Sequence, residues 1–269
     1  METTNIKEKT GIVALIDLLG AKYFTKEQNI KFIKNRDQLI GYAHEISKNF
    51  LKGLDCEEQL DISTIGDTIV ICWPFSNPNK TLFYLKGMFH IIKTFISLSI
   101  FNQNFYRGAI SIGEYLTSDD TILGPAITDA AGWYEKADWF GVVLTPKCDI
   151  TVTRILAEEK PSKNTLECPM DILAVKYRVP IKGEEISLFC IAWPFEIFML
   201  KHYTGIDKFI QELPPLAAVT NFIYNIEIPL GTERKYYNSL DFFSYYGMNI
   251  FPKMKNTPYF KSIQQDYKK

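Results

Sequence analysis

The feature that most constrains the fold of this chain is a run of ten residues, GIVALIDLLG, that begins at Gly11 and ends at Gly20. A single charged residue, Asp17, interrupts it. A short and nearly continuous apolar run of this kind is typical of a central strand that is buried on both faces of a sheet. The sequence therefore predicts a central strand over this run, with Asp17 at its exit.

The segments that follow alternate between helical and strand patterns. The pattern predicts a long amphipathic helix over Lys26–Leu54 with Ile30 and Ile33 on its apolar face, two strands about a Gly66–Asp67 corner, a helix over Thr81–Ile100, a strand over Tyr106–Leu116, a turn and helix over Thr121–Glu135, and a short strand over Val142–Thr145. This order is typical of an α+β fold: a ferredoxin-like, palm-type sandwich with a mainly antiparallel sheet and helices on it.

The pattern changes beyond Pro161. Asp171–Val179 and Ile186–Ala192 are consistent with a terminal hairpin, while Phe195–Ile210 and Leu216–Met248 are helical in pattern and rich in aromatic residues. We therefore divide the chain into a first domain over residues 10–160 and a helical C-terminal extension over residues 161–269, packed on it. Six aromatic residues of the extension are expected to pack a helix onto the core: Tyr236, Tyr237, Phe242, Phe243, Tyr245 and Tyr246.

Composition excludes several classes of function. The 30 basic and 31 acidic residues nearly cancel, so no overall field attracts nucleic acid or an anionic membrane. A polar N-terminus and the absence of an apolar run long enough to span a bilayer predict a cytoplasmic protein without membrane contact. The five cysteines are widely spaced, without a CxxC or Cys/His cluster, and are predicted to be buried, reduced thiols. His44, His90 and His202 are isolated, which gives nucleophilic catalysis little support.

Asp17 and Asp67 are the residues that carry chemistry. Two carboxylates at the exits of adjacent strands repel each other, and a divalent cation relieves that repulsion. Two carboxylates with substrate phosphates and water are the usual ligands of Mg²⁺ in phosphoryl-transfer sites. The alternative is structural: Asp17 caps the following turn and Asp67 forms the hairpin.

Four segments of the chain resemble, in order and spacing, the blocks that mark class III nucleotide cyclases. They are ALIDLLGAKYF, STIGDTIVI, YRGAISIGEYL and ILGPAITDAAGWYE, and they cover roughly the first half of the chain. The chain also resembles the cyclase-fold pyrimidine cyclases of bacterial anti-phage signalling.

The resemblance implies a metal-dependent site in a homodimer. Asp17 and Asp67 would bind two Mg²⁺ or Mn²⁺ ions, and the Leu18 carbonyl would add a ligand. The turn after the strand would present backbone N–H groups to the phosphates; its residues are Leu18, Leu19, Gly20, Ala21 and Lys22.

Matching these four segments to the family's blocks also shows where the chain departs from the family. The two base-reading positions fall on Ser63 and Thr121, so neither purine-reading pair is present. The ribose-orienting asparagine becomes Thr128, and the transition-state arginine becomes Gly132. Four cations are alternatives for the missing charge, although a solvated surface role is expected of each: Lys22, Arg107, Lys136 and Lys147.

Two functions remain open from the sequence. The first is a nucleotide cyclase, a phosphorus–oxygen lyase that converts a nucleoside triphosphate to a 3′,5′-cyclic mononucleotide and pyrophosphate in bacterial signalling or defence. A pyrimidine base is slightly preferred, because both base-reading positions carry small hydroxyl residues. The second is a catalytically degenerate module of the same fold that binds a nucleotide or a protein partner.

Overall fold

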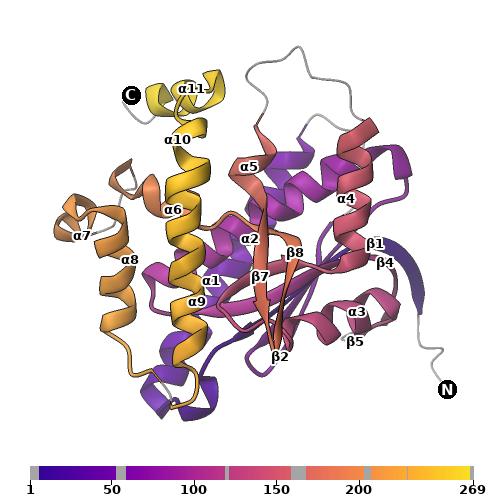
Figure 1. The fold of residues 1–269 in the computed structure, drawn as a ribbon. Coiled ribbons are helices and arrows are strands. Elements are labelled where there is room, and N and C mark those ends of the chain that lie inside the picture. Colours follow the sequence, from indigo (N-terminus) through magenta and orange to yellow (C-terminus); the bar gives the residue numbers. More distant parts are fainter. Residues whose placement is uncertain are drawn as a thin grey trace.

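A computed structural model describes residues 6–52, 59–118, 121–158, 168–202, 207–228 and 230–266. In the first half of the chain the elements are β1 (Lys7–Leu18), α1 (Lys26–Leu51), β2 (Asp61–Ile65), β3 (Thr68–Pro74), α2 (Thr81–Phe101), β4 (Tyr106–Ser118), β5 (Thr121–Leu123), α3 (Pro125–Tyr134), β6 (Gly141–Leu144) and α4 (Pro146–Glu158). The element order predicted from sequence is confirmed, with two additions: β5, a short strand in the predicted turn, and the helix α4 (Figure 1).

The second half begins with α5 (Met170–Leu173) and the hairpin of β7 (Ala174–Ile181) and β8 (Glu184–Ile191). The helices that follow are α6 (Pro194–Phe198), α7 (Lys208–Glu212), α8 (Pro215–Tyr224), α9 (Glu233–Tyr245), α10 (Phe251–Met254) and α11 (Pro258–Asp266). A π-helical turn over Tyr246–Ile250 joins α9 to α10. The two long helices expected here are thus divided into shorter ones, and Pro194, Pro214 and Pro215 stand at or beside two of the new helix starts.

The strands form one mainly antiparallel sheet in the order β2-β3-β1-β4-β6-β8-β7, with β5 beside β4. Only the β4–β6 pair among the described strands is parallel. β1 lies between β3 and β4, which confirms the predicted central strand. The hairpin joins the sheet through the Cys190–Val143 pairing, so the sheet continues past residue 160. The division of the chain into two domains stays a prediction.

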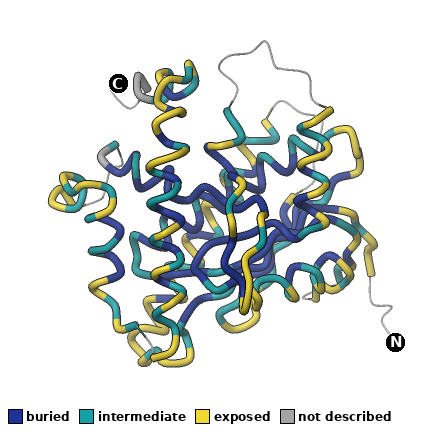
Figure 2. Tube along the Cα trace, viewed as in Figure 1, coloured by how far each residue is buried: buried dark blue, intermediate teal, exposed yellow. Residues whose placement is uncertain are grey.

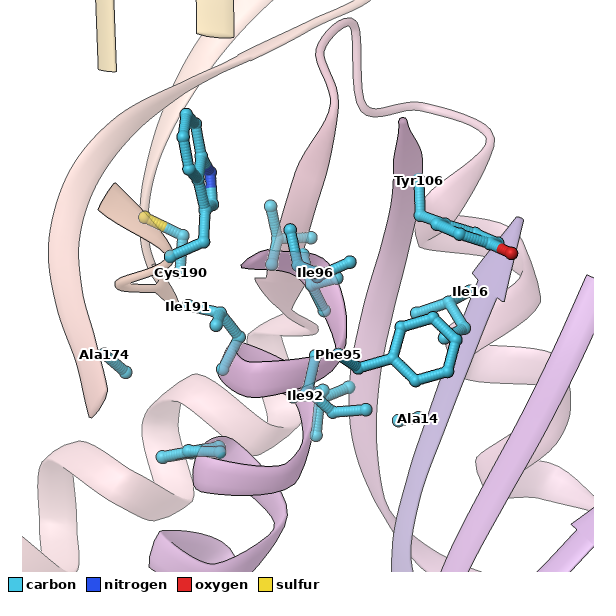
Figure 3. Packing of buried hydrophobic residues seen from close by; sticks show 14 of the residues in the cluster. Ala14, Ile16, Ile92, Phe95, Ile96, Tyr106, Ala174, Cys190 and Ile191 are labelled. Carbon is cyan, nitrogen blue, oxygen red and sulfur yellow. The ribbon is translucent and has the colours of Figure 1, made fainter. Parts of the chain in front are cut away.

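The two faces of the sheet are covered by different helices. Ala14 and Ile16 of β1 pack against Ile92, Phe95 and Ile96 of α2 (Figure 3). The alternate residues of β1 and β4 lie on the opposite face, where α3 packs: Ser111 of β4 donates a hydrogen bond to the Ala126 carbonyl of α3. The strands β1, β3, β4 and β6 and the helix α2 are largely buried, whereas β2 and β5 are half-buried or exposed (Figure 2). The predicted α+β sandwich is therefore confirmed.

The buried face of α1 differs from the prediction. Ile30 and Ile33 are 47% and 45% exposed, whereas Phe32 is 5% exposed. Phe32 is turned to the core because its ring packs edge-on against Phe24, with ring centroids 6.4 Å apart. The apolar stripe of α1 thus runs through Phe32, Leu39 and Ala43.

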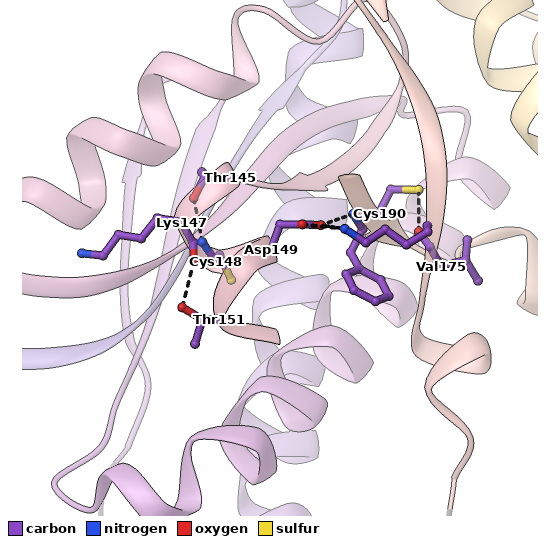
Figure 4. A network of polar contacts seen from close by, with 9 residues as sticks. Thr145, Lys147, Cys148, Asp149, Thr151, Val175 and Cys190 are labelled. Atoms are coloured by element: carbon purple, nitrogen blue, oxygen red, sulfur yellow. Dashed lines mark hydrogen bonds and ion pairs between the residues drawn. The ribbon is translucent and has the colours of Figure 1, made fainter. Parts of the chain in front are cut away.

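A polar network ties α4 to the hairpin (Figure 4). The buried Asp149 of α4 accepts hydrogen bonds from Lys176 Nζ at 2.7 Å and from the Phe189 N–H at 2.6 Å. Tyr177, the next residue of β7, faces the other way and contacts Phe242 of α9 at 4.9 Å between ring centroids. Hence α4 and α9 pack on opposite faces of the hairpin. The buried carboxylate of Asp149 is paired with the Lys176 cation.

The aromatic residues of α9 are divided between core and surface. Tyr236, Phe242, Phe243 and Tyr246 are buried, whereas Tyr237 is 68% exposed. Cys72, Cys148 and Cys190 are buried free thiols whose pKa values are raised by burial, as expected from sequence. Cys168 is a free thiol that is only half-buried, and Cys56 lies outside the described residues. No helix within the described ranges is long and apolar enough to cross a membrane.

The end of α2 yields a prediction about stability. The N–H of Asn104 donates to the Ser99 carbonyl, and the N–H of Gln103 donates to that of Ile100, which is the pattern of a Schellman C-cap. Gln103 has φ 61°, a left-handed conformation that favours glycine. Gln103→Gly is therefore expected to raise the free energy of unfolding by roughly 0.5–1 kcal/mol in urea denaturation. Asn102→Gly is the control: its φ is −89°, so the same measurement should show a loss, and equal gains would contradict the interpretation.

Candidate functional site

Asp17 lies next to the last residue of β1, at the centre of the sheet. It is paired with Thr68 on β3 and with Arg107 on β4, and directly paired residues project from the same face. The Thr68 hydroxyl donates to Asp17 Oδ1 at 2.9 Å, and the Arg107 guanidinium lies 3.3 Å from Asp17 Oδ2. Asp17 is therefore held by one neighbour on each side.

Asp67 occupies the corner between β2 and β3, one residue before Thr68. Gly66 has φ 64° and is the first of two turn residues, as in a type II′ hairpin. This turn sets Asp67 beside the end of β1, because Thr68 is the pairing partner of Asp17. The two predicted aspartates thus lie on neighbouring strands at one end of the sheet.

The electrostatics of the pair fit a divalent cation. Burial and then the Asp17 charge raise the pKa of Asp67, with a smaller opposing effect of Arg107. The negative charge of the pair is therefore only partly neutralised within the chain. The two oxygens of Asp17 offer about four lone-pair sites, of which Thr68 and Arg107 use only part. Among the described residues no cluster of three or more His, Cys, Asp or Glu side chains could hold a metal, so further ligands would come from backbone, substrate and water.

The raised pKa of Asp67 gives a pH prediction for the metal-free protein. Its folded-state pKa lies above the unfolded value, so the ionised form costs stability at neutral pH, and that cost disappears as the pH falls through the folded pKa. Relative to Asp67→Asn, the wild type should therefore gain stability on mild acidification. Urea denaturation of both proteins with a chelator measures this difference. A wild type that instead loses stability relative to the variant over that range would contradict it.

The Leu18 carbonyl is directed toward Asp67, as its predicted role as a metal ligand requires. The Phe75 N–H donates to the Thr10 carbonyl and the Leu19 N–H donates to Phe105, so even-numbered residues of β1 direct their backbone groups to β3 and odd-numbered ones to β4. Leu18 lies one residue beyond the β1–β3 pairing, and its backbone groups are directed toward Asp67.

The turn after β1 is only partly available for phosphate. The Leu19 N–H is already bonded to the Phe105 carbonyl at 2.8 Å, a contact that the sequence did not reveal. Gly20 has φ 83° and precedes the short 3₁₀ helix Ala21–Tyr23. The first hydrogen bond of that helix is donated by the Tyr23 N–H. The N–H groups of Gly20, Ala21 and Lys22 come before it, so they have no partner within the helix.

Of the four alternative cations, Arg107 contacts Asp17. Its side chain is 16% exposed and its guanidinium lies 5.1 Å from the ring centroid of Tyr134 on α3, so the surface role expected from sequence is wrong for Arg107. Lys22 and Lys136 are exposed over neighbouring aromatic rings. Lys147 lies near Gly113, six residues along β4 from Arg107. The pairing of strands, which sequence periodicity does not specify, selects Arg107.

Lys235 of α9 is a residue that sequence analysis missed. Burial and then the Arg107 charge lower its pKa, while Asp138 and Asp17 act in the opposite direction. Its helix is fixed here because Ser239 accepts from the Phe140 N–H at 2.8 Å and Arg234 pairs with Asp138 at 3.1 Å. The extension therefore brings a positive charge into electrostatic range of Asp17. Only the long-range packing of α9 against the segment before β6 reveals it.

The base-reading and ribose positions lie on β2, β5 and α3. Ser63 is half-buried on β2. Thr121 is exposed and pairs with Ser118, the last residue of β4, whereas Arg107, which contacts Asp17, is the second residue of β4. Thr128 and Gly132 are exposed on α3, and the Thr128 hydroxyl donates to the Gly124 carbonyl. The structure thus brings together Asp17, Asp67 and the turn, but not Thr121.

Comparison with known proteins identifies only solved structures. No protein-family model and no curated protein sequence matches the chain. The adenylyl cyclase CyaB from P. aeruginosa is 10% identical, with a TM-score of 0.43, over 70% of this chain and 95% of that one. An adenylate/guanylate cyclase/hydrolase from Silicibacter pomeroyi is 16% identical, with a TM-score of 0.39, over 70% and 98%. A class III adenylyl cyclase-like ATP-binding protein from P. aeruginosa is 9% identical, with a TM-score of 0.29, over 55% and 35%. Solved structures to which this chain is similar thus include an adenylyl cyclase, an adenylate/guanylate cyclase/hydrolase and a class III adenylyl cyclase-like ATP-binding protein.

Proposed function

We propose that this protein is a metal-dependent nucleotide cyclase that converts a nucleoside triphosphate to a 3′,5′-cyclic mononucleotide and pyrophosphate. The observation that carries the proposal is the pair Asp17 and Asp67 at the ends of adjacent central strands, with a charge that Arg107 only partly neutralises. A structural pair would be expected to have its charges balanced within the chain.

Each residue of the site has a proposed role. Asp17 and Asp67, with the Leu18 carbonyl, would hold Mg²⁺ or Mn²⁺, which when bound activates the ribose 3′-hydroxyl and stabilises charge on the triphosphate. Gly20, Ala21 and Lys22 orient the phosphates through their N–H groups. Arg107 and Lys235 add positive charge on the side of Asp17 where charge develops, in place of the arginine absent at Gly132.

The base and the biological role follow from the sequence rather than from the site. Ser63 and Thr121 carry small hydroxyl groups at the base-reading positions, which slightly favours a pyrimidine. Thr128 stands at the ribose-orienting position. We place the reaction in bacterial signalling or anti-phage defence, in the cytoplasm, on the strength of the resemblance stated above.

Product analysis tests the proposal directly. The purified protein is incubated with each of the four ribonucleoside triphosphates and Mn²⁺ or Mg²⁺, and the products are identified by mass. A cyclic mononucleotide with pyrophosphate is expected from one of them. Binding of a triphosphate without any product would favour the second candidate, a module of the same fold without turnover. Thr128 and Gly132 support this candidate, because they replace the asparagine and arginine that the family uses in the reaction.

We also predict that the protein forms a homodimer through its first domain. Thr121 and Asp17 lie toward opposite ends of β4, so a site containing both needs a second copy. Exposed apolar residues occur on the elements that carry Asp67 and Thr121: Ile65 is 73% exposed in the β2–β3 hairpin and Leu123 is 60% exposed on β5. A two-fold dimer is the commonest closed assembly.

Light scattering at micromolar concentration measures the dimer. Leu123→Asp should shift the protein toward monomer and reduce turnover. Tyr224→Asp on α8 is the matched control, because Tyr224 is 86% exposed on the extension and should leave the dimer intact. A wild-type monomer with full activity would overturn the prediction.

A further inference from the structure

A second site lies behind the turn that follows Asp17. A pocket of about 760 Å³ is lined by this turn, the start of α1, the α2–β4 connection and the α8–α9 connection. Its residues include Leu19, Gly20, Phe32, Asn104, Ile226 and Tyr236. The volume lies in the range of small-molecule sites. Neither Asp17 nor Asp67 lines the pocket, so it is separate from the candidate metal site.

Asn104 is the residue of this pocket that points to a ligand. Its residue is only 7% exposed, yet its side-chain Nδ2 has no hydrogen-bond partner among the described residues. A buried amide donor without a partner costs roughly 1–3 kcal/mol, so it is rare without a functional reason. Because Asn104 lines the pocket, a rotation of its side chain would present this donor to an occupant with an acceptor atom.

The connection that carries Asn104 is also held in an unfavourable conformation. Gln103 adopts the left-handed conformation at a helix end where glycine is the usual residue, and Gln103 is part of the pocket lining. A non-glycine residue at such a position is consistent with a use for its side chain in the pocket.

The chemistry of the lining restricts the occupant. Phe24, Phe32 and Tyr236 supply aromatic surface, and Phe32 and Tyr236 are almost fully buried. Lys31 and Glu227 have opposite charges and are exposed, so the deep part of the pocket contains no unbalanced charge. A neutral, flat ring with an acceptor on its edge fits aromatic walls and the buried amide donor of Asn104.

We propose that this pocket binds a nucleobase or nucleoside, with a carbonyl or ring nitrogen accepting from Asn104 Nδ2. The site stands on its own geometry. Its effect on the turn, through Leu19 and Gly20, rests on the proposed function: an occupied pocket fixes the backbone that is proposed to orient the phosphates, and so changes triphosphate turnover.

The test uses the full chain with uridine, cytidine, adenosine and guanosine, in the presence of a chelator. At least one nucleoside should raise the melting temperature, and ribose alone should not. Asn104→Leu keeps the approximate side-chain volume but removes the donor. It should weaken nucleoside binding, measured by calorimetry, by at least about tenfold, while the melting temperature of the free variant stays level or rises.

Asn35→Leu is the matched control, because Asn35 Nδ2 is also buried without a partner among the described residues but Asn35 does not line the pocket. It should bind the nucleoside as the wild type does, and so should Asp67→Asn. Ile226→Trp, which fills the pocket from the extension, should also abolish binding and serves if Asn104→Leu does not fold.

The outcomes separate this proposal from the proposed function. If no nucleoside shifts the wild type, or if the shift survives Asn104→Leu and Ile226→Trp, the pocket proposal is overturned whatever the turnover. If binding is lost in Asp67→Asn, the nucleoside lies in the metal site, which also overturns it. Nucleoside binding that leaves the turnover of the wild type unchanged overturns the effect on the turn, whereas a protein that binds nucleoside but makes no cyclic product contradicts the proposed function instead.

Discussion

Asp67→Asn is expected to lower triphosphate turnover by at least ~100-fold, while the free energy of unfolding stays level or rises. A bound metal contributes several kcal/mol of charge stabilisation in the transition state, and ~1.4 kcal/mol corresponds to a tenfold change in rate. Stability does not fall because burial and the Asp17 charge raise the pKa of Asp67, so the substitution removes an unfavourable carboxylate. Asparagine also keeps the volume and turn preference of aspartate.

Melting temperatures with and without Mn²⁺, alongside turnover, measure this effect. Mn²⁺ should stabilise the wild type and leave Asp67→Asn unchanged. The control is Asp61→Asn on the same hairpin: Asp61 pairs with Lys9 at 2.7 Å and accepts from Tyr115, away from Asp17. It should lose some stability and keep its turnover. If Asp67→Asn retains both wild-type turnover and stabilisation by Mn²⁺, Asp67 holds no metal.

Lys93→Met is expected to lower the free energy of unfolding by about 3–5 kcal/mol. Lys93 of α2 is 3% exposed, and its Nζ lies 2.5 Å from Glu196 Oε1 on α6, whose side chain is 9% exposed. It also lies 4.7 Å from the ring centroid of Phe195. Methionine fills the same space but removes the cation that lies against the buried Glu196 Oε1. This pair is the most deeply buried ion pair among those of the described residues.

Chemical denaturation of two further variants separates charge from packing. Lys93→Met with Glu196→Gln should recover most of the loss, since both charges are then removed. Lys176→Met should cost less than Lys93→Met, because Lys176 is 41% exposed and Asp149 keeps its bond from the Phe189 N–H. A loss below ~1 kcal/mol in Lys93→Met would show that the pair contributes as little as a surface ion pair.

Local features of the sequence determined much of the first half of the fold. The apolar run that ends at Gly20 defined β1, because a short and continuous apolar run fits a strand that is buried on both faces of a sheet. Gly66 fixed the corner of the hairpin, because glycine readily adopts a positive φ. These two local rules placed Asp17 and Asp67 at strand ends. The pairing of β1 with β3 then followed from the order of elements.

The tertiary structure alone decided the partners of those residues. Arg107 reaches Asp17 through the register of β1 and β4, and Lys235 approaches it through the packing of α9, more than two hundred residues along the chain from Asp17. The buried face of α1 depends on the contact between Phe24 and Phe32, and the pocket that Asn104 lines depends on four segments that meet in the fold. Hydrophobic periodicity describes one element at a time, and it carries no information about which distant side chain packs against that element. Strand register and helix packing supply that information, and they exist only in the folded chain.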